Sequence, residues 1–404
     1  MMTRIEFIKR SIAAGVGLPL LASILTSCED EGLILPTGGE DFEGKVLIIG
    51  AGAAGLTTAY LLHKLNIDFE VLEASSDFGG RVKRIEGFAD FPIDLGAEWI
   101  HTDPSILNQI AGNEKPNEEI ETIVYNPQEI SLWKDEDLKT RDWAKRFYSE
   151  YKYKNTTWYG FLENYIVPDI FDRIVFDAPV DQIDYTSDKV LVRTAAQNAQ
   201  TYEAERVIVT VPVKILQGDS IEFRPTLPSR KTEAIESITV GDALKVFIEF
   251  EERFYPDILM FGPLIQAAFR DNKIFYDAAF GKDTSRHVLG LFTINEQASD
   301  YTELETDEKI IERILDELDE VFDGQARQYY KQHIIQNWTA EPYIQGAYSY
   351  DFLGDRSQIM ADLFAPVEEK LFFAGEALSD ANQATVHGAC ESAYTVVSRM
   401  LEKQ

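Results

Sequence analysis

A glycine-rich turn near residue 50 restricts the possible folds of this chain more than any other segment. Residues 45–49 form a short run rich in β-branched side chains, which is typical of a buried parallel strand. Gly50, Gly52 and Gly55 follow, and an apolar helical pattern then runs through residues 56–62. The spacing Gly-x-Gly-x-x-Gly allows a tight turn, close approach of the backbone to a pyrophosphate, and close packing of helix on strand. The segment therefore predicts a dinucleotide-binding strand–turn–helix unit.

The next strand supports this interpretation. Residues 68–72 are expected to form a second parallel strand, and it ends at Glu73, where an acidic side chain can accept hydrogen bonds from ribose hydroxyls. Ala53 and Ala54 lie at the start of the helix, whose free N–H groups and dipole favour a phosphate. These residues predict a Rossmann-like unit but do not distinguish FAD from NAD.

The residues after Glu73 bear on that choice. The run from Glu73 and Ala74 to Gly80 and Arg81 resembles the "EA…GGR" stretch of the glutathione-reductase-like FAD enzymes. The resemblance implies FAD as the cofactor, with the two glycines passing beside the dinucleotide. It also implies a charge-assisted contact from Arg81 to the phosphates.

Size and charge exclude some classes of protein. The chain has 404 residues and 45% hydrophobic residues, which predicts more than one folded domain and excludes a disordered protein. Its formal net charge is −31. An acidic surface repels phosphate backbones, so we expect no nucleic-acid partner. It would concentrate cationic small molecules near a cleft, although the acidity can equally serve solubility alone.

The first 28 residues have the pattern of an export signal. Arg4, Lys9 and Arg10 precede an uncharged, mostly apolar run over residues 11–27 that contains Pro19. This is typical of a signal peptide, since a membrane-spanning helix needs about 20 apolar residues. Residues 3–9 also look like a twin-arginine signal with Ile5 in place of the second arginine, so the export route stays open.

Cys28 closes this segment in a sequence, Leu-Thr-Ser-Cys, that resembles a bacterial lipobox. The resemblance implies a lipid-modified Cys28 at the mature N-terminus, and an exported, membrane-anchored lipoprotein at the periplasmic or cell surface. The alternative is an ordinary signal peptide with a chance cysteine. Cys390 is then the one thiol left, so no internal disulfide is expected.

Five later motifs follow one another in the order found in the flavin monoamine and polyamine oxidases. The first, residues 94–101, reads Asp-Leu-Gly-Ala-Glu-Trp-Ile-His and resembles the "DLGAxWIHG" segment of that family, with Thr102 at the final glycine. The resemblance implies that His101 reaches the substrate cavity, although a lone histidine can equally be structural. It also implies that the backbone lies along the flavin at Gly96, Ala97, Glu98 and Trp99.

The second and third motifs lie in the middle of the chain. The run 180–216 resembles the family's middle FAD segment, which implies a backbone contact from Val180 to adenine. Residues 241–250 resemble a family strand that carries one lysine, and this implies that Lys245 holds a water against flavin N5. Burying a lysine in an apolar strand is costly. The alternative is that Lys245 points to solvent, which the two-residue period of a strand permits.

The last motifs lie near the C-terminus. Residues 338–350 resemble the family's "W…GxYxY" segment, which implies that Tyr348 orients the amine nitrogen. In the monoamine oxidases a cysteine just before this tyrosine binds FAD covalently. This chain has Ala347 there, so we expect FAD to be bound non-covalently. Residues 371–376 resemble an FAD-contact strand that ends at Gly375 and Glu376. Thr385 and Val386 then open a helix like the family's "TVHGA", whose N-terminus can stabilise negative charge on the reduced flavin.

These observations predict an α/β fold, with a Rossmann-like FAD-binding domain of the glutathione-reductase type and an interleaved α+β substrate domain. We expect a signal peptide over 1–27 and an acidic tether over 28–43. The FAD-binding domain is expected from 44–100, 176–240 and 341–404, and the substrate domain from 101–175 and 241–340. Within the latter, residues 307–322 have the period of a surface helix.

The family resemblance implies an FAD-dependent enzyme that oxidises a monoamine or polyamine by hydride transfer to flavin, with Lys245, Tyr348 and His101 at the reacting centre. Oxygen would then accept the electrons, with release of H₂O₂ and an imine or aldehyde. No metal is expected. The alternatives are an L-amino acid oxidase or another FAD oxidoreductase of the same fold, or a non-catalytic flavin-binding surface protein. The region 101–158 is short for the family, and its tyrosines and tryptophan can form either a lid or core.

Overall fold

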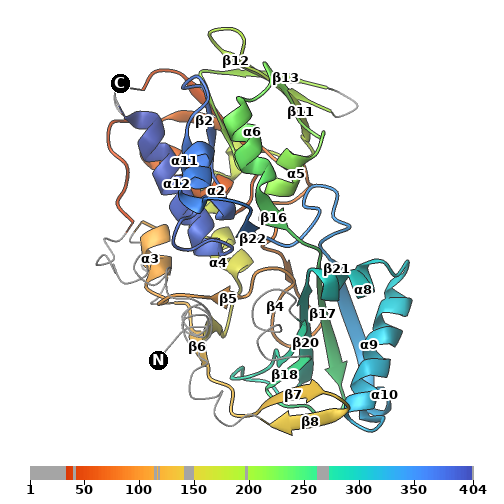
Figure 1. Ribbon diagram of the computed structural model, residues 1–404. Helices are drawn as coiled ribbons and strands as arrows, with labels where there is room; N and C mark the ends of the chain where they lie inside the picture. The colour runs from red at the N-terminus through yellow and green to blue at the C-terminus, as the bar shows by residue number, and fades with distance from the viewer. Residues whose placement is uncertain are drawn as a thin grey trace.

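A computed structural model of the chain describes residues 33–39, 42–112, 116, 119–140, 150–195, 199–261 and 273–402 (Figure 1). The expected signal peptide and Cys28 lie outside these residues. Within the described chain, five strands form a parallel sheet in the order β10 (Ile174–Val175), β2 (Asp68–Leu72), β1 (Lys45–Ile49), β14 (Arg206–Val209) and β23 (Leu371–Phe373). The predicted strands 45–49 and 68–72 are therefore confirmed.

Both faces of the parallel sheet are covered, as its apolar sequence requires. Val46 and Ile48 of β1 pack into a core with α2 (Ala53–Lys64), α4 (Trp158–Tyr165) and α12 (Val386–Leu401). The other face is covered by three helices, α5 (Val213–Gln217), α6 (Ser229–Glu236) and α11 (Arg356–Phe364). A four-stranded sheet also covers it, in the order β13 (Thr201–Ala204), β12 (Val190–Thr194), β11 (Val180–Asp184) and β15 (Glu222–Arg224). This is the predicted α/β Rossmann-like arrangement.

A seven-stranded mixed sheet forms the lower half of the molecule in Figure 1. Its order within the described residues is β21 (Tyr330–Asn337), β17 (Ala243–Phe250), β20 (His287–Ile294), β19 (Lys273–Asp277), β18 (Ile258–Phe261), β7 (Ile130–Lys134) and β8 (Asp137–Thr140). The helices α8 (Glu296–Thr302), α9 (Asp307–Val321) and α10 (Gln325–Tyr329) lie along one side. The apolar stripe of α9 is buried against this sheet, which confirms the helix predicted at 307–322.

The alternation of β17 explains how a lysine comes to be buried there. Leu244, Val246 and Ile248 face α9 in one core, whereas Phe247 packs into a second core on the opposite face with residues of segment 93–95. Because side chains alternate along a strand, Lys245 shares the face of Phe247. Every residue of β17 is buried, so neither face is left to solvent.

Short elements join the two large sheets. They are α3 (Ile106–Ile110), the three-stranded sheet β5 (Trp99–Ile100), β9 (Glu150–Tyr153) and β6 (Thr122–Tyr125), and the pairs β3 (Arg84–Ile85) with β4 (Ile93–Asp94) and β16 (Ile238–Val240) with β22 (Ser349–Phe352). α4 and β10 pack with the parallel sheet, although we assigned 101–175 to the substrate domain. The division into domains stays a prediction.

The described part of the expected tether lies against the folded body. Residues 33–39 are placed there, and the Leu33 N–H donates to Gln109 Oε1 at 3.0 Å. Leu33 also packs against the core around α2, which its apolar side chain explains. In the described ranges, no helix is both long and apolar enough to cross a bilayer. Cys390 is a buried free thiol.

Three aromatic side chains after His101 are core, and Tyr151 is partly buried against them. Tyr153 and Trp158 are almost fully buried and meet edge to face, with ring centroids 5.4 Å apart. Tyr159 stacks on Phe78 at 4.6 Å. Of the two interpretations left open, core therefore holds for these residues, while Tyr148 lies outside the described chain.

Candidate functional site

A cavity of about 1900 Å³ lies between the parallel sheet and the seven-stranded sheet. Of the residues predicted to form the site, all but Gly55 line it: Gly50, Gly52, Ala53, Ala54, Glu73, Ala74, Gly80, Arg81, Gly96, Ala97, Glu98, Trp99, His101, Val180, Lys245, Tyr348, Gly375, Glu376, Thr385 and Val386. Gly55 instead packs against the turn that follows β1, because an added Cβ would lie 1.9 Å from the Gly50 carbonyl oxygen. The structure thus joins motifs that are far apart in sequence, while their individual roles stay predictions.

One part of the cavity is shaped for a dinucleotide. Gly50 has φ of +104°, a left-handed conformation that side chains rarely adopt, at the turn into α2. A Cβ on Gly52 or Gly80 would project where nothing lies closer than 3.5 Å, so the backbone there is open to a ligand. The first turn of α2 supplies N–H groups and the positive end of the helix dipole. These features fit the pyrophosphate of FAD.

Glu73 is held in place by the same turn. Its carboxylate accepts the Ala51 N–H at 2.6 Å and the Ser75 N–H at 2.9 Å. Burial raises the pKa of Glu73, although these N–H groups act in the opposite direction. The carboxylate lines the cavity between the turn and Val180, which is the end expected to hold the ribose and adenine.

Arg81 connects the glycine-rich part of the cavity to the C-terminal motifs. Its Nη1 donates to the Ala347 carbonyl at 2.8 Å and to Glu376 Oε1 at 3.0 Å. Glu376 also accepts the Ser349 hydroxyl at 2.6 Å. One ion pair therefore orders three separate motifs around the cavity, and the predicted contact of Arg81 with phosphate stays a prediction.

Thr385 is the N-cap of α12. Its hydroxyl accepts the Gly388 N–H at 2.9 Å and donates to the Asn382 carbonyl at 2.7 Å. The N-terminus of α12, at Val386, faces the cavity as predicted for the helix beside the flavin ring. Thr385 is thus used locally in a cap, which a tyrosine at this position could not form.

Lys245 is 4% exposed, so the alternative in which it points to solvent is wrong. Its Nζ donates to the carbonyls of Asp94 at 2.7 Å and Gly96 at 2.9 Å, and to Glu98 Oε2 at 2.8 Å. An ammonium has three hydrogens, and these three acceptors can take all of them. Lys245 therefore ties β17 to the segment expected along the flavin; its predicted contact with a flavin-bound water stays a prediction.

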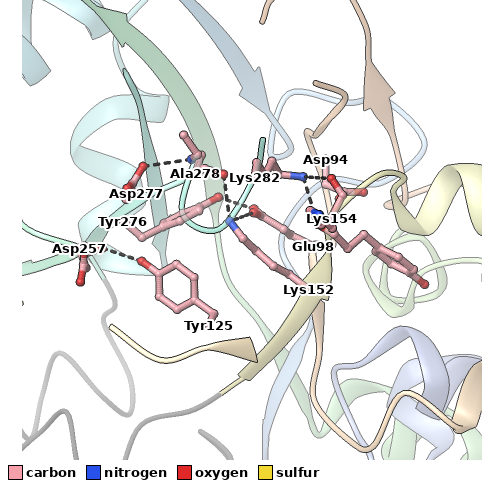
Figure 2. Close-up of polar contacts among 12 residues, drawn as sticks. Asp94, Glu98, Tyr125, Lys152, Lys154, Asp257, Tyr276, Asp277, Ala278 and Lys282 are labelled. Atoms are coloured by element: carbon pink, nitrogen blue, oxygen red, sulfur yellow. Dashed lines mark hydrogen bonds and ion pairs between the residues drawn. The ribbon is translucent and has the colours of Figure 1, made fainter. Parts of the chain in front are cut away.

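Glu98 lies between two buried lysines. Besides Lys245, Lys152 Nζ lies 3.7 Å from Glu98 Oε1 and donates to the Ala278 carbonyl at 2.9 Å, as Figure 2 shows. The Tyr276 hydroxyl donates to Glu98 Oε2 at 2.5 Å. Burial alone would raise the pKa of Glu98, but the two ammonium groups hold it below its ordinary value. Burial lowers the pKa of Lys152 to about 8.

His101 has a buried carboxylate partner. Its Nδ1 lies 3.2 Å from Oε2 of Glu150, a residue of β9 with no exposed surface, while 19% of the histidine side chain is accessible. The ring is therefore oriented by β9 at the edge of the cavity, and its predicted part in the reaction stays a prediction.

Aromatic rings flank this end of the cavity. Tyr348 stacks with Phe292, with ring centroids 6.4 Å apart and planes 15° apart. Trp338 is held by a hydrogen bond from Nε1 to the Leu95 carbonyl at 3.1 Å. Together with Trp99, these rings provide flat apolar walls for an alkyl chain.

Sequence reasoning missed Glu150, Lys152 and Tyr276, which support the predicted site from outside the cavity. Glu150 and Lys152 alternate with tyrosines, and this pattern is ordinarily that of an exposed strand face. A signal that could have found them is the presence of charges inside a strongly aromatic stretch. Their partners could not be found in the same way, because they lie on distant segments.

Comparison with known proteins agrees with this geometry. The flavin-containing amine oxidoreductase family matches residues 159–401, and an NAD(P)-binding Rossmann-like domain matches residues 48–110. Polyamine oxidase 2 of Arabidopsis thaliana is 24% identical over 85% of this chain and 85% of its own length. Lysine-specific histone demethylase 2 of Homo sapiens is 23% identical over 89% of this chain and 54% of its own length.

Solved structures show the same fold at lower identity. A mutant putrescine oxidase with redesigned cofactor binding has a TM-score of 0.72 at 18% identity, covering 89% of this chain and 98% of its own. Cyclohexylamine oxidase from Brevibacterium oxydans IH-35A has a TM-score of 0.72 at 16% identity, covering 89% and 99%.

The fold and cavity define an FAD-binding oxidoreductase with a second, substrate-facing sheet. Because the family match spans more than half of the chain, the protein belongs to the flavin-containing amine oxidoreductases. It is an FAD-dependent enzyme that oxidises amines, as the sequence motifs predicted.

Proposed function

We propose that this enzyme oxidises a primary or secondary aliphatic amine, a monoamine or a polyamine, and uses O₂ as the electron acceptor to release H₂O₂ and an imine or aldehyde. One observation carries the proposal: Lys245, His101 and Tyr348 line the same cavity as the glycine-rich dinucleotide cradle. When bound, FAD supplies the hydride acceptor and the route for electrons to oxygen.

The chain's own residues would bind and orient the amine. The stacked rings of Tyr348 and Phe292 provide a wall against which the alkyl chain can lie. Exclusion of water by this wall favours the neutral form of the amine, because desolvation lowers the pKa of an ammonium group. Tyr348 is the residue we expect to orient the amine nitrogen.

A polyamine or diamine would also need a binding group for its second, charged nitrogen. Glu341 lines the cavity and is 33% exposed; its Oε1 accepts Gln336 Nε2 at 2.6 Å and lies 3.4 Å from Lys83 Nζ. A carboxylate at the rim and a formal net charge of −31 both favour cationic substrates. The names of relatives, including polyamine oxidase 2, support the same substrate class.

An L-amino acid substrate is less well accommodated. Such a substrate needs a guanidinium for its carboxylate, and the arginines that line the described cavity wall are Arg81 and Arg356. Arg81 is paired with Glu376, and Arg356 donates to the Asp380 carbonyl at 2.7 Å. Arg81 is therefore engaged by a carboxylate within the protein, whereas Arg356 is 43% exposed and is the arginine that L-amino acids in an assay would test.

A peroxide assay over a panel of monoamines, diamines, polyamines and L-amino acids tests the proposal. We expect H₂O₂ with one or more amines, together with bleaching of the flavin absorbance when the same amine is added without oxygen. Peroxide from amino acids alone would replace the proposal with an amino acid oxidase. No reduction by any member of the panel would favour a non-catalytic flavin-binding protein.

A further inference from the structure

Two strands that are remote in sequence bring a carboxylate to His101. Glu150 begins β9, the central strand of the three-stranded sheet, and β5 ends one residue before His101. The Nδ1–Oε2 distance of 3.2 Å is that of a hydrogen bond, and Glu150 is fully buried. A buried carboxylate is costly unless it is hydrogen-bonded or paired with a charge, so this contact is a specific feature of the site.

The contact determines which nitrogen of His101 carries the proton. An ionised carboxylate only accepts hydrogen bonds, so Nδ1 must be the donor. In neutral imidazole the other nitrogen, Nε2, then has a lone pair and is an acceptor. The ring lines the cavity while Nδ1 is turned to the buried Glu150, which leaves Nε2 for a ligand in the cavity.

Charged and titratable side chains reach this region from three elements. Glu150 and Lys152 are alternate residues of β9, Glu98 belongs to the segment that leads to His101, and His387 lies in the first turn of α12. Burial lowers the pKa of His387 to about 3, and the nearby His101 acts in the same direction. His387 therefore stays neutral, and Lys152 and Glu98 face each other. Glu150 is the charged group bonded directly to His101.

We infer that Glu150 positions His101 as the acceptor of the proton that the substrate ammonium must lose before oxidation. This role rests on the proposed function. The N–H bond of the substrate ammonium breaks, its electron pair stays on the amine nitrogen, and the proton forms a new bond to Nε2. The imidazolium is balanced by the Glu150 carboxylate and returns the proton to water when the product leaves.

The energetics explain why the carboxylate is needed. An alkyl ammonium such as that of lysine has a pKa near 10.4 in water, and a free imidazolium has a pKa near 6.5. Proton transfer from the ammonium to the imidazole is therefore unfavourable, by a pKa difference of about 4. Desolvation of the substrate reduces this gap, and so does an opposite charge within hydrogen-bond distance of the imidazolium that forms. Glu150 supplies that charge.

The tautomer is tested directly by NMR. The chain has five histidines, so ¹⁵N imidazole spectra of the FAD-loaded protein can be assigned by single substitutions. We expect His101 in the Nδ1–H form, and we expect the ¹⁵Nδ1 chemical shift of His101 to change in Glu150→Gln, because the hydrogen bond then loses its charged acceptor. His333, whose Nδ1 is hydrogen-bonded to Tyr330, is the internal reference and should not move. An Nε2–H tautomer of His101, or an unchanged ¹⁵Nδ1 chemical shift in Glu150→Gln, overturns the inference.

Kinetics then separate positioning from general support of the fold. In Glu150→Gln we expect stopped-flow flavin reduction at pH 7 to slow by about ten- to a hundredfold. This is less than the roughly 10²- to 10⁴-fold contribution of a general base, because His101 itself is retained. Glu150→Asp keeps the charge and should recover part of the rate. In a His101→Gln background, Glu150→Gln should cause no further loss, whereas additive losses would show that Glu150 acts independently of His101.

Glu121→Gln is the matched control, because Glu121 lies near the same sheet but is 62% exposed and pairs with Lys154. It should leave the rate unchanged. If Glu150→Gln does not fold, the Asp variant and the His101 tautomer in the wild type still decide the inference. If the proposed function is wrong, the wild-type enzyme will oxidise no amine. If only the role of Glu150 and His101 is wrong, the wild-type enzyme will still oxidise amines.

Discussion

The ammonium nitrogen of Lys245 lies 2.8 Å from Oε2 of Glu98, and both side chains are almost fully buried. The same ammonium also binds the carbonyls of Asp94 and Gly96, so a single side chain of β17 fixes the backbone of the segment beside the cavity. The pair therefore connects the substrate-facing sheet with the segment expected to carry the flavin. Changes to either residue should affect stability as well as catalysis.

Glu98→Gln should destabilise the protein. The substitution leaves the Lys245 and Lys152 ammonium groups buried without their carboxylate, and breaking a buried pair by removing one partner costs about 3 to 5 kcal/mol. Urea unfolding of the FAD-loaded protein measures this loss. As a control, Glu305→Gln removes an exposed partner of Lys309 and should change stability by less than about 1 kcal/mol. Equal small losses in the two variants would contradict the prediction.

Lys245→Met nearly preserves volume while it removes the charge and the donors. Glu98 keeps Lys152 at 3.7 Å as an ammonium partner, so we expect a variant that is less stable but still folds and retains FAD. Flavin reduction by amine, or its reoxidation by oxygen, should slow by about ten- to a thousandfold, the scale of one lost catalytic donor. Stopped-flow measurement of each half-reaction identifies the affected step. Wild-type rates in both, with FAD retained, would show that Lys245 serves only to hold the segment that contains Glu98.

The fold was predictable where local patterns suffice. Residues 45–49 and 307–322 have the period of a buried strand and of an amphipathic helix, and both elements form there. The burial of Lys245 could not be derived in this way. Alternation along β17 shows that Lys245 and Leu244 face opposite sides, but it does not show that residues 93–98 cover the second side. That cover depends on tertiary packing between distant segments.

The supporting charges of the site were missed for the same reason. Glu150 and Lys152 look like the exposed face of a strand, yet β9 is the central strand of its sheet and both are buried. They are tolerated because Glu150 is hydrogen-bonded to His101 and Lys152 lies 3.7 Å from the Glu98 carboxylate. Motif resemblance located the cavity lining, whereas the residues behind that lining required the structure.

Purified protein should be yellow, and acid precipitation should release its FAD into the supernatant. The reason is that Ala347, which lines the cavity next to Tyr348, has no thiol for a covalent bond to the flavin. Absorbance spectra of the supernatant and the pellet after precipitation give the result. Flavin retained in the pellet would contradict non-covalent binding.

We propose that Cys28, which lies outside the described residues, anchors the enzyme to a membrane through a lipid. Cys28→Ser should then move the enzyme from the membrane fraction to the soluble fraction in a bacterial host, because the single acyl-bearing attachment site is lost. Mass spectrometry of the mature N-terminus is the second measurement. Unchanged fractionation, or a mature N-terminus elsewhere, would count against the anchor.

Lys152 should make stability depend on pH between about 8 and 10.5. Burial lowers the pKa of Lys152 in the folded protein to about 8 from an ordinary value of 10.5, so in this interval the unfolded chain binds more protons than the folded one. Stability therefore rises with pH across the interval, and below pH 8 the full cost of burying the ammonium is present.

Other lysines and tyrosines also titrate in this interval, so the comparison must be with Lys152→Met at each pH. As the pH rises from 7.5 to 10.5, the free energy of unfolding of the wild type should gain about 3 kcal/mol relative to that of the variant. Parallel stability curves would show that Glu98, at 3.7 Å, keeps Lys152 charged throughout the interval.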